Sequence, residues 1–173
     1  MYILSIIALF ISDIVFLSAS MALRVDDVMQ KKVHTIDCEL STKYAAKMMD
    51  YLRISSLVVL SNGRVVGILT ERDLVSNVVA RACNSEKLYV KDVMSSPVIT
   101  CRPNTLLENA VQSMLQNKIK KLPVMAGKND EDLVGILSIT DIARLHPVLY
   151  SKVLEYQNIT QPLDHEKVGT YIQ

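Results

Sequence analysis

The sequence GILTERDL at positions 67–74 decides the fold of this chain, because it returns as GILSITDI at positions 135–142. Each copy starts with an apolar run typical of a buried strand and continues with helical spacing. A hydroxyl residue, Thr70 or Ser138, stands at the change, and a carboxylate, Asp73 or Asp141, follows three residues later. This is the spacing of a helix capping box, in which the two side chains bond to free backbone amides.

The same junctions also have the chemistry of a nucleotide site. Free amides at a helix start favour an anion, and the hydroxyls of Thr70 and Ser138 add donors for it. Asp73 and Asp141 are unsuited to a phosphate, but a carboxylate accepts hydrogen bonds well from the vicinal hydroxyls of a ribose. A capping box alone explains both copies, so the motif by itself leaves both interpretations open.

The junctions belong to a longer internal repeat, which begins at Val25 and ends before the tail at 147–173. VDDVM at 25–29 returns as VKDVM at 90–94, which is 65 residues later, and the same offset relates many further positions. The offset becomes 68 at Gly67 and Gly135 because a loop of the second copy is three residues longer. An internal repeat in constant register predicts two copies of one structural unit.

Each copy is predicted to fold as β-α-β-β-α. Apolar residues with strand or helix periodicity define the elements, and Asn62-Gly63 is a type I′ hairpin signal. A capping box of Thr105 and Glu108 is expected before the first helix of the second copy. The strands are expected at 33–36, 57–60 and 64–69, then at 98–101, 122–125 and 133–137, and the helices at 45–52, 74–82, 107–114 and 142–145.

The chain therefore divides into residues 21–84 and 85–146 as two repeats, with an apolar segment at 1–20 and a tail at 147–173. One repeat is too small to cover both sides of its sheet, so we expect an α+β fold of α/β type in which two repeats pack face to face. In the tail, Pro147 suits the first turn of a helix that either extends the last helix or docks on a partner subunit.

Three interpretations of residues 1–20 remain open. As a helix the segment would be about 30 Å long, the thickness of a membrane's hydrocarbon core. The basic residues Arg24, Lys31 and Lys32 follow it, so a membrane anchor would leave the repeats in the cytoplasm. Otherwise the segment is an apolar helix packed on the protein, or a spurious extension before a true start at Met21.

Composition argues against several functions. The 19 basic and 18 acidic residues give a net charge of +1, without the basic excess of a nucleic-acid-binding protein. Three scattered cysteines and three scattered histidines lack metal-ligand spacing, and the cysteines favour a reducing compartment. Since the phosphate-loop, nucleophile-elbow and zinc-protease motifs are also absent, we expect no catalytic residue and no metal or catalytic cofactor.

Taken together, the repeated motifs resemble the cystathionine β-synthase-type domain, called the CBS domain, in a stand-alone tandem pair or Bateman module. The resemblance covers about residues 21–146 and is carried by the two DVM motifs, RISSLVV at 53–59, KIKKLPV at 118–124 and the two junctions. It implies two repeats related by a pseudo-twofold axis with two clefts between them. It also implies binding of adenosyl ligands: AMP, ADP, ATP or S-adenosylmethionine.

The resemblance further implies that each cleft combines one junction with strands of the other repeat. One cleft would use Thr70, Arg72 and Asp73, with Val98, Ile99, Ile119, Lys120 and Lys121. The other would use Ser138, Thr140 and Asp141, with Val33, His34, Ile54 and Ser55. The basic pair that often precedes Leu-Pro-Val in the family is kept at Lys120 and Lys121 but replaced by serines in the first repeat, so we expect the cleft containing Asp73 to bind phosphate more tightly.

We therefore expect a regulatory module that binds an adenosyl ligand and transmits the bound state to an unknown partner protein. A cytoplasmic homodimer is implied by the resemblance, with membrane contact possible only through residues 1–20. The alternative is a ligand-free disc that serves for dimerisation or protein docking.

Overall fold

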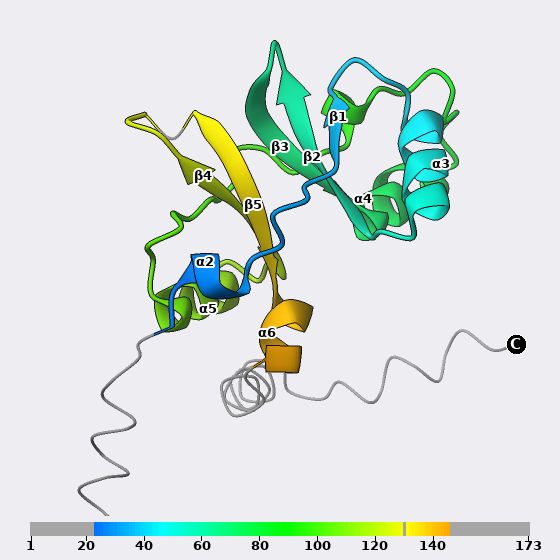
Figure 1. Cartoon of the computed structure of the whole chain (residues 1–173). Coiled ribbons are helices and arrows are strands. Elements are labelled where there is room, and N and C mark those ends of the chain that lie inside the picture. The colour runs from blue at the N-terminus through cyan, green and yellow to red at the C-terminus, as the bar shows by residue number, and fades with distance from the viewer. Residues whose placement is uncertain (1–22, 130, 146–173) are drawn as a thin grey trace, which may run out of the picture.

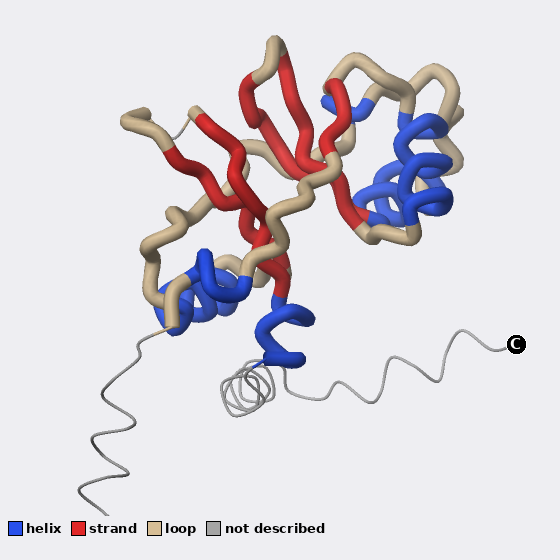
Figure 2. Tube along the Cα trace, viewed as in Figure 1, coloured by secondary structure: helices blue, strands red, loops and turns tan. Residues whose placement is uncertain are grey.

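The computed structural model describes residues 23–129 and 131–145 and shows an α+β fold of two similar units. Figure 1 shows the strands of the two units side by side in the middle of the molecule. The helices of each unit lie on the side of its strands that faces away from the other unit (Figure 2). The interpretations offered for residues 1–20 and 147–173 lie outside the described residues.

The first unit contains a three-stranded sheet. Strand β1 (Thr35–Asp37) pairs in parallel with β2 (Ser56–Ser61), which pairs antiparallel with β3 (Arg64–Thr70). The helix α3 (Thr42–Leu52) joins β1 to β2 and buries the apolar face that its spacing predicts. At the tip of the hairpin, Asn62 and Gly63 have φ values of 49° and 75°. Positive φ at both central residues confirms the type I′ turn.

The second unit repeats the hairpin but not the first strand. Helix α5 (Leu107–Gln116) is followed by the antiparallel pair β4 (Lys121–Ala126) and β5 (Asp132–Ser138), and then by α6 (Ile139–Leu145). The strand predicted at 98–101 is wrong, since only Cys101 forms a parallel bridge, to Val124. Prolines at 97 and 103 flank this segment, and proline has no amide to donate to a ladder.

The predicted capping box of Thr105 and Glu108 is also wrong. Helix α5 begins at Leu107, and its N-cap residue makes no side-chain cap bond. The hydroxyl of Thr105 instead accepts from the backbone amide of Arg102 at 3.1 Å, which closes the preceding turn. The Leu107 amide donates to the carbonyl of Leu23 at 2.8 Å. The start of the helix is therefore bonded to a segment far away in sequence, which the local motif does not encode.

The helix predicted at 74–82 differs in type from the prediction. The α-helix α4 (Glu71–Leu74) is followed directly by a π-helical turn (Val75–Val79). The turn buries Val78 in the core, and the side-chain amide of Asn77 donates to the carbonyl of Val93 at 3.3 Å. Contacts with a distant segment therefore accompany the wider turn, which helical spacing alone does not reveal.

The segments carrying the two DVM motifs pack in the opposite units. Helix α2 (Val25–Val28), from the first repeat, buries Val25 and Val28 in the core of the second unit, where it contacts β5 and α6. The 3-10 turn Val90–Asp92, from the second repeat, buries Val90 in the core of the first unit. Figure 1 shows α2 beside α5 and α6, far from α3. Each hydrophobic core is therefore built from both sequence repeats.

The repeated glycines allow this exchange. A Cβ atom on Gly67 would lie 2.6 Å from the sulfur of Met94, and one on Gly135 would lie 2.5 Å from the sulfur of Met29. Each DVM methionine thus packs directly on a glycine in the hairpin of the other repeat. Any side chain at these two glycines would push the exchanged segment away from its strand.

Candidate functional site

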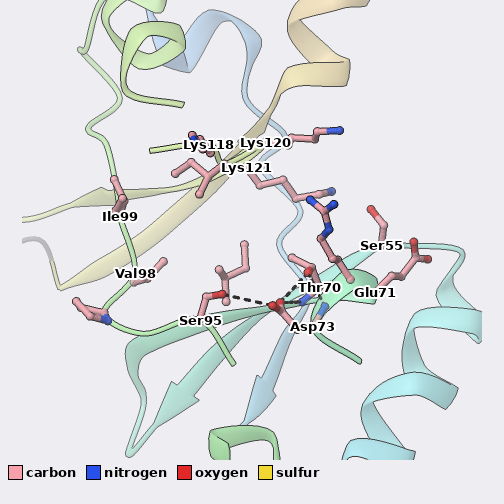
Figure 3. Close-up of a pocket in the computed structure, with 14 residues that line it drawn as sticks. Ser55, Thr70, Glu71, Asp73, Ser95, Val98, Ile99, Lys118, Lys120 and Lys121 are labelled. Atoms are coloured by element: carbon pink, nitrogen blue, oxygen red, sulfur yellow. Dashed lines mark hydrogen bonds between the residues drawn. The ribbon is translucent and has the colours of Figure 1, made fainter. Parts of the chain in front are cut away.

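The first junction forms the capping box that its sequence predicts. The Thr70 amide donates to Oδ2 of Asp73 at 2.8 Å, and the Asp73 amide donates to the Thr70 hydroxyl oxygen at 3.3 Å. The Thr70 hydroxyl donates back to Asp73 Oδ2 at 2.6 Å. The other carboxylate oxygen, Oδ1, lies 3.5 Å from the Ser95 hydroxyl (Figure 3). Asp73 is therefore fixed through one oxygen and keeps acceptor capacity on the other.

A pocket of about 480 Å³ opens over this junction. Its volume falls within the range of roughly 300–1,000 Å³ that is usual for small-molecule sites. Both repeats contribute to its wall, since β3 and α4 face the 95–99 and 118–121 segments across the opening (Figure 3). The lining residues are Ser55, Ile68, Thr70, Glu71, Arg72, Asp73, Ser95, Pro97, Val98, Ile99, Lys118, Ile119, Lys120 and Lys121.

The pocket has an apolar end and a charged end. Figure 3 shows Val98 and Ile99 on one side, with Ser55 and Glu71 on the opposite side and the carboxylate of Asp73 in between. The lysines of the 118–121 segment lie along the remaining edge (Figure 3). An aromatic base could contact the apolar end while a polar group attached to it reaches the cations.

Lys121 is the cation most enclosed by the protein. Strand pairing places it opposite Ser138, and its side chain is half-buried. Burial lowers the pKa of the Lys121 ammonium, and the charges of Asp141 and Glu71 raise it by a smaller amount. The protein therefore compensates the charge of Lys121 only in part, so an anion in the pocket would stabilise the charged form.

The second junction repeats two of these bonds. The Ser138 hydroxyl donates to Asp141 Oδ2 at 2.5 Å, and the Asp141 amide donates to the Ser138 hydroxyl oxygen at 3.2 Å. The side-chain amide of Gln30 donates to Asp141 Oδ1 at 3.3 Å. Gln30 and Ser95 each follow a DVM motif, so each repeat supplies one polar residue to the aspartate of the other.

The structure brings together the residues expected in the first cleft. All eight of them line the pocket described above: Thr70, Arg72, Asp73, Val98, Ile99, Ile119, Lys120 and Lys121. Ser55, which was expected in the second cleft, also lines this pocket. The bond from the Glu71 amide to the carbonyl of Ser55 at 3.1 Å holds it beside α4.

The other six residues expected in the second cleft do not line this pocket. Ser138 and Asp141 are half-buried and bonded to each other, and Thr140 is exposed. Val33, His34 and Ile54 are half-buried. Ile54 packs against the core of the first unit.

Sequence reasoning missed four polar residues at the two junctions, namely Gln30, Glu71, Ser95 and Lys118. The sequence repeat could have identified Gln30 and Ser95, because they occupy equivalent positions directly after Met29 and Met94. Lys118 adopts a left-handed backbone conformation with φ 54°, as its equivalent Arg53 does. This turn at the end of α5 carries Lys118 to the pocket.

Neither a metal-binding cluster nor a membrane-spanning helix occurs among the residues that the structure describes. These residues contain no group of three or more His, Cys, Asp and Glu side chains able to hold a metal ion. Among the same residues, no helix has both the length and the apolar character needed to cross a bilayer.

Comparison with known proteins identifies the repeats. The family model described as CBS domain matches residues 25–80 and 90–147. A protein of Methanopyrus kandleri is 32% identical over 117 residues, which are 68% of this chain and 59% of that protein. The CBS domain-containing protein YhcV of Bacillus subtilis is 32% identical over 119 residues, which are 69% of this chain and 82% of that protein.

Solved structures share the same architecture. The CBS domain pair of protein MJ0100, solved in complex with 5′-methylthioadenosine and S-adenosyl-L-methionine, superposes with a TM-score of 0.66 and 26% sequence identity. The superposition covers 73% of this chain and 98% of that one.

Proposed function

Because the chain belongs to the CBS domain family and carries two of its repeats, we propose that it is a regulatory module that binds an adenosyl ligand in the pocket over Thr70 and Asp73. The candidate ligands are AMP, ADP, ATP and S-adenosylmethionine. One solved relative was crystallised with two adenosyl compounds, which supports this ligand class for the present chain.

One observation carries the proposal. The pocket places Oδ1 of Asp73, an acceptor for a ribose diol, between the apolar side chains of Val98 and Ile99 and the side of Ser55 toward which Lys120 extends. An adenosyl ligand has its base, its ribose and its charged group in that order. We propose that the base contacts Val98, Ile99 and Ile119, that the ribose bonds to Asp73, and that Thr70 and the cations meet the phosphate.

We propose a second, weaker cleft around Ser138, Thr140 and Asp141, with Val33, His34 and Ile54. In the first cleft the residues before Leu-Pro-Val are Lys120 and Lys121, whereas their equivalents Ser55 and Ser56 are uncharged. A phosphate at the second junction would therefore meet fewer cations from the opposite repeat.

The module is proposed to act without catalysis, by transmitting its bound state to a partner protein. A ligand shifts a conformational equilibrium only if it binds two arrangements with different affinity. We further propose that the module is cytoplasmic and that it forms a homodimer. Exposed apolar residues near the helical side of the first unit could form the dimer interface, namely Tyr51, Val75 and Val79. Tyr51 is 86% exposed and Val79 is 71% exposed.

A specific observation favours the alternative of a ligand-free docking disc. Thr70 and Asp73 satisfy each other in a complete capping box, so their presence needs no ligand. In that case the exposed apolar residues would carry the function and the pocket would stay empty.

Thermal unfolding with each adenosyl compound separates these alternatives. A ligand at 100 times its dissociation constant adds about 2.7 kcal/mol to the free energy of unfolding. Asp73→Ala should weaken binding by about 10- to 100-fold, because a hydrogen bond to a charged group contributes ~1.5 to 3 kcal/mol. Native mass spectrometry of the same samples reports the oligomer and any nucleotide that co-purifies.

Asp92→Ala is the matched control. Asp92 accepts from the Tyr89 amide at 3.0 Å, so it caps a turn as Asp73 does, but it does not line the pocket. Both variants should unfold at a lower temperature, and only Asp73→Ala should lose the ligand-induced shift. If no adenosyl compound stabilises the unchanged protein, the docking disc is the better explanation. If Asp141→Ala is more damaging than Asp73→Ala, the ranking of the two clefts is wrong.

A further inference from the structure

The charges around the pocket distinguish among the candidate adenosyl ligands. Four cationic side chains line it, and two carboxylates do so. The cations come from both repeats: Arg72 from α4, and Lys118, Lys120 and Lys121 from the end of α5 and the start of β4. The pocket therefore has an excess of positive charge, although the chain as a whole is close to neutral.

The four cations are not neutralised by ion pairs within the described part of the chain. The ion pairs found there join Lys43 to Glu86, Arg53 to Asp50, and Lys91 to Glu39. None of these involves a cation of the pocket, and all three lie on the surface. Arg72 and the three lysines are therefore available for an anionic ligand.

The two carboxylates are poorly placed to attract a cationic ligand. Asp73 Oδ2 already accepts two hydrogen bonds from Thr70, and Oδ1 faces the Ser95 hydroxyl. Glu71 is exposed to solvent, as are Arg72, Lys118 and Lys120, so water and salt screen these four charges alike. The half-buried ammonium of Lys121, which Asp141 and Glu71 compensate only in part, would repel a ligand that carries a positive charge next to its ribose.

The cations are spread along the pocket and do not converge on one point. Figure 3 shows Lys118 nearest the side of Ile99 and Lys120 extending toward the side of Ser55. A single phosphate is too small to reach all four cations at once. A chain of two or three phosphates, running from the ribose position at Asp73 toward Ser55, would reach several of them.

The geometry points to a nucleoside polyphosphate, such as ADP or ATP, as the ligand of this pocket, in preference to a nucleoside monophosphate or a sulfonium-bearing adenosyl compound. This inference rests on the proposed function and narrows it to one class of ligand. Lys120 and Lys121 are the residues that make the selection, through charge-assisted hydrogen bonds to the second and third phosphates. Lys118 lies nearer the side of Ile99, away from this path.

Isothermal titration of the full chain with ATP, AMP, S-adenosylmethionine and inorganic triphosphate, without divalent cations, tests the inference. ATP should bind at least about tenfold more tightly than AMP, because one charge-assisted bond contributes that factor. S-Adenosylmethionine should bind more weakly than AMP. Inorganic triphosphate should bind more weakly than ATP, because it does not contact Val98 and Ile99.

Single variants assign the selection to residues. Lys120→Gln and Lys121→Gln should each reduce the ratio of ATP to AMP affinity by about tenfold. Lys87→Gln is the control, because Lys87 is exposed and does not line the pocket. Circular dichroism of each variant checks that the fold is retained.

The possible failures are distinguishable. If AMP or S-adenosylmethionine binds as tightly as ATP, the inference is overturned while the proposed function stands. The same holds if both lysine variants leave the ratio of ATP to AMP affinity unchanged. If no adenosyl compound binds, the proposed function itself fails, and the inference fails with it.

Discussion

Replacing Val25 by alanine should destabilise the second unit, although Val25 belongs to the first repeat in sequence. Val25 is fully buried, in the core that also contains Ile142, although it comes from the first repeat. The change removes two methyl groups, or about 1.6 kcal/mol of transfer free energy at roughly 0.8 kcal/mol each. The cavity left behind raises the expected loss to about 2 to 3 kcal/mol.

Double-mutant cycles measured by urea unfolding show which core Val25 stabilises. Ile142→Val and Ile36→Val are the same chemical change at buried positions of the second and the first unit. Each should cost about 0.5 to 1.5 kcal/mol alone. Val25→Ala should couple to Ile142→Val by about 0.5 kcal/mol or more and should add to Ile36→Val within about 0.3 to 0.5 kcal/mol.

The reverse cycle is the internal control. Val90 is fully buried in the core of the first unit, so Val90→Ala should couple to Ile36→Val and be additive with Ile142→Val. Coupling of Val25→Ala to Ile36→Val, with additivity toward Ile142→Val, would refute the exchange of segments. In that case each sequence repeat would form its own core.

Three further outcomes are expected. Gly67→Ala should lower the free energy of unfolding by about 1 to 3 kcal/mol, because its Cβ would lie 2.6 Å from the sulfur of Met94; a urea midpoint unchanged from that of the parent protein would contradict this. An alkylating reagent at pH 8 should modify the exposed Cys83 far faster than Cys101, because burial raises the pKa of the Cys101 thiol to about 11. Equal labelling of the two cysteines in peptide mass spectrometry would contradict the burial of Cys101. Burial lowers the pKa of Lys121 below 10.5, so the unfolded chain binds this proton more tightly than the folded protein does. The free energy of unfolding should therefore rise with pH between the lowered pKa and 10.5, and the affinity for ATP should fall over the same range. If the variant Lys121→Gln kept both trends in such titrations, this assignment would be contradicted.

Features encoded over a few residues could be predicted from sequence. The hairpin at Asn62-Gly63 and the capping box of Thr70 and Asp73 form as expected. Ser138 accepts from the Asp141 amide, which is one half of the box expected there. The buried face of α3 is also as predicted. In each case the interacting groups lie close together along the chain, so their spacing alone defines the geometry.

The repeat and the family resemblance added information over a longer range. They placed Thr70 and Asp73 opposite Val98 and Ile99, and the structure brings these residues to one pocket. Spacing alone would not have paired them, because about 25 residues separate the two groups in sequence. Ser55 was expected in the other cleft and Lys118 was not predicted, because the positions of both residues depend on how the two units meet.

The remaining features depend on tertiary packing. The segment at 98–101 has strand-forming residues but forms only one bridge, and the helix after Asp73 continues as a π-helical turn. Most of all, the two sequence repeats do not correspond to the two hydrophobic cores, because Val25 and Val90 are buried in opposite units. An apolar DVM segment has the same pattern whether it packs on its own repeat or on the other. The unit on which a DVM segment packs depends on which of the strands carrying Gly67 and Gly135 the segment can approach. The positions of these strands are defined only when both units are folded together.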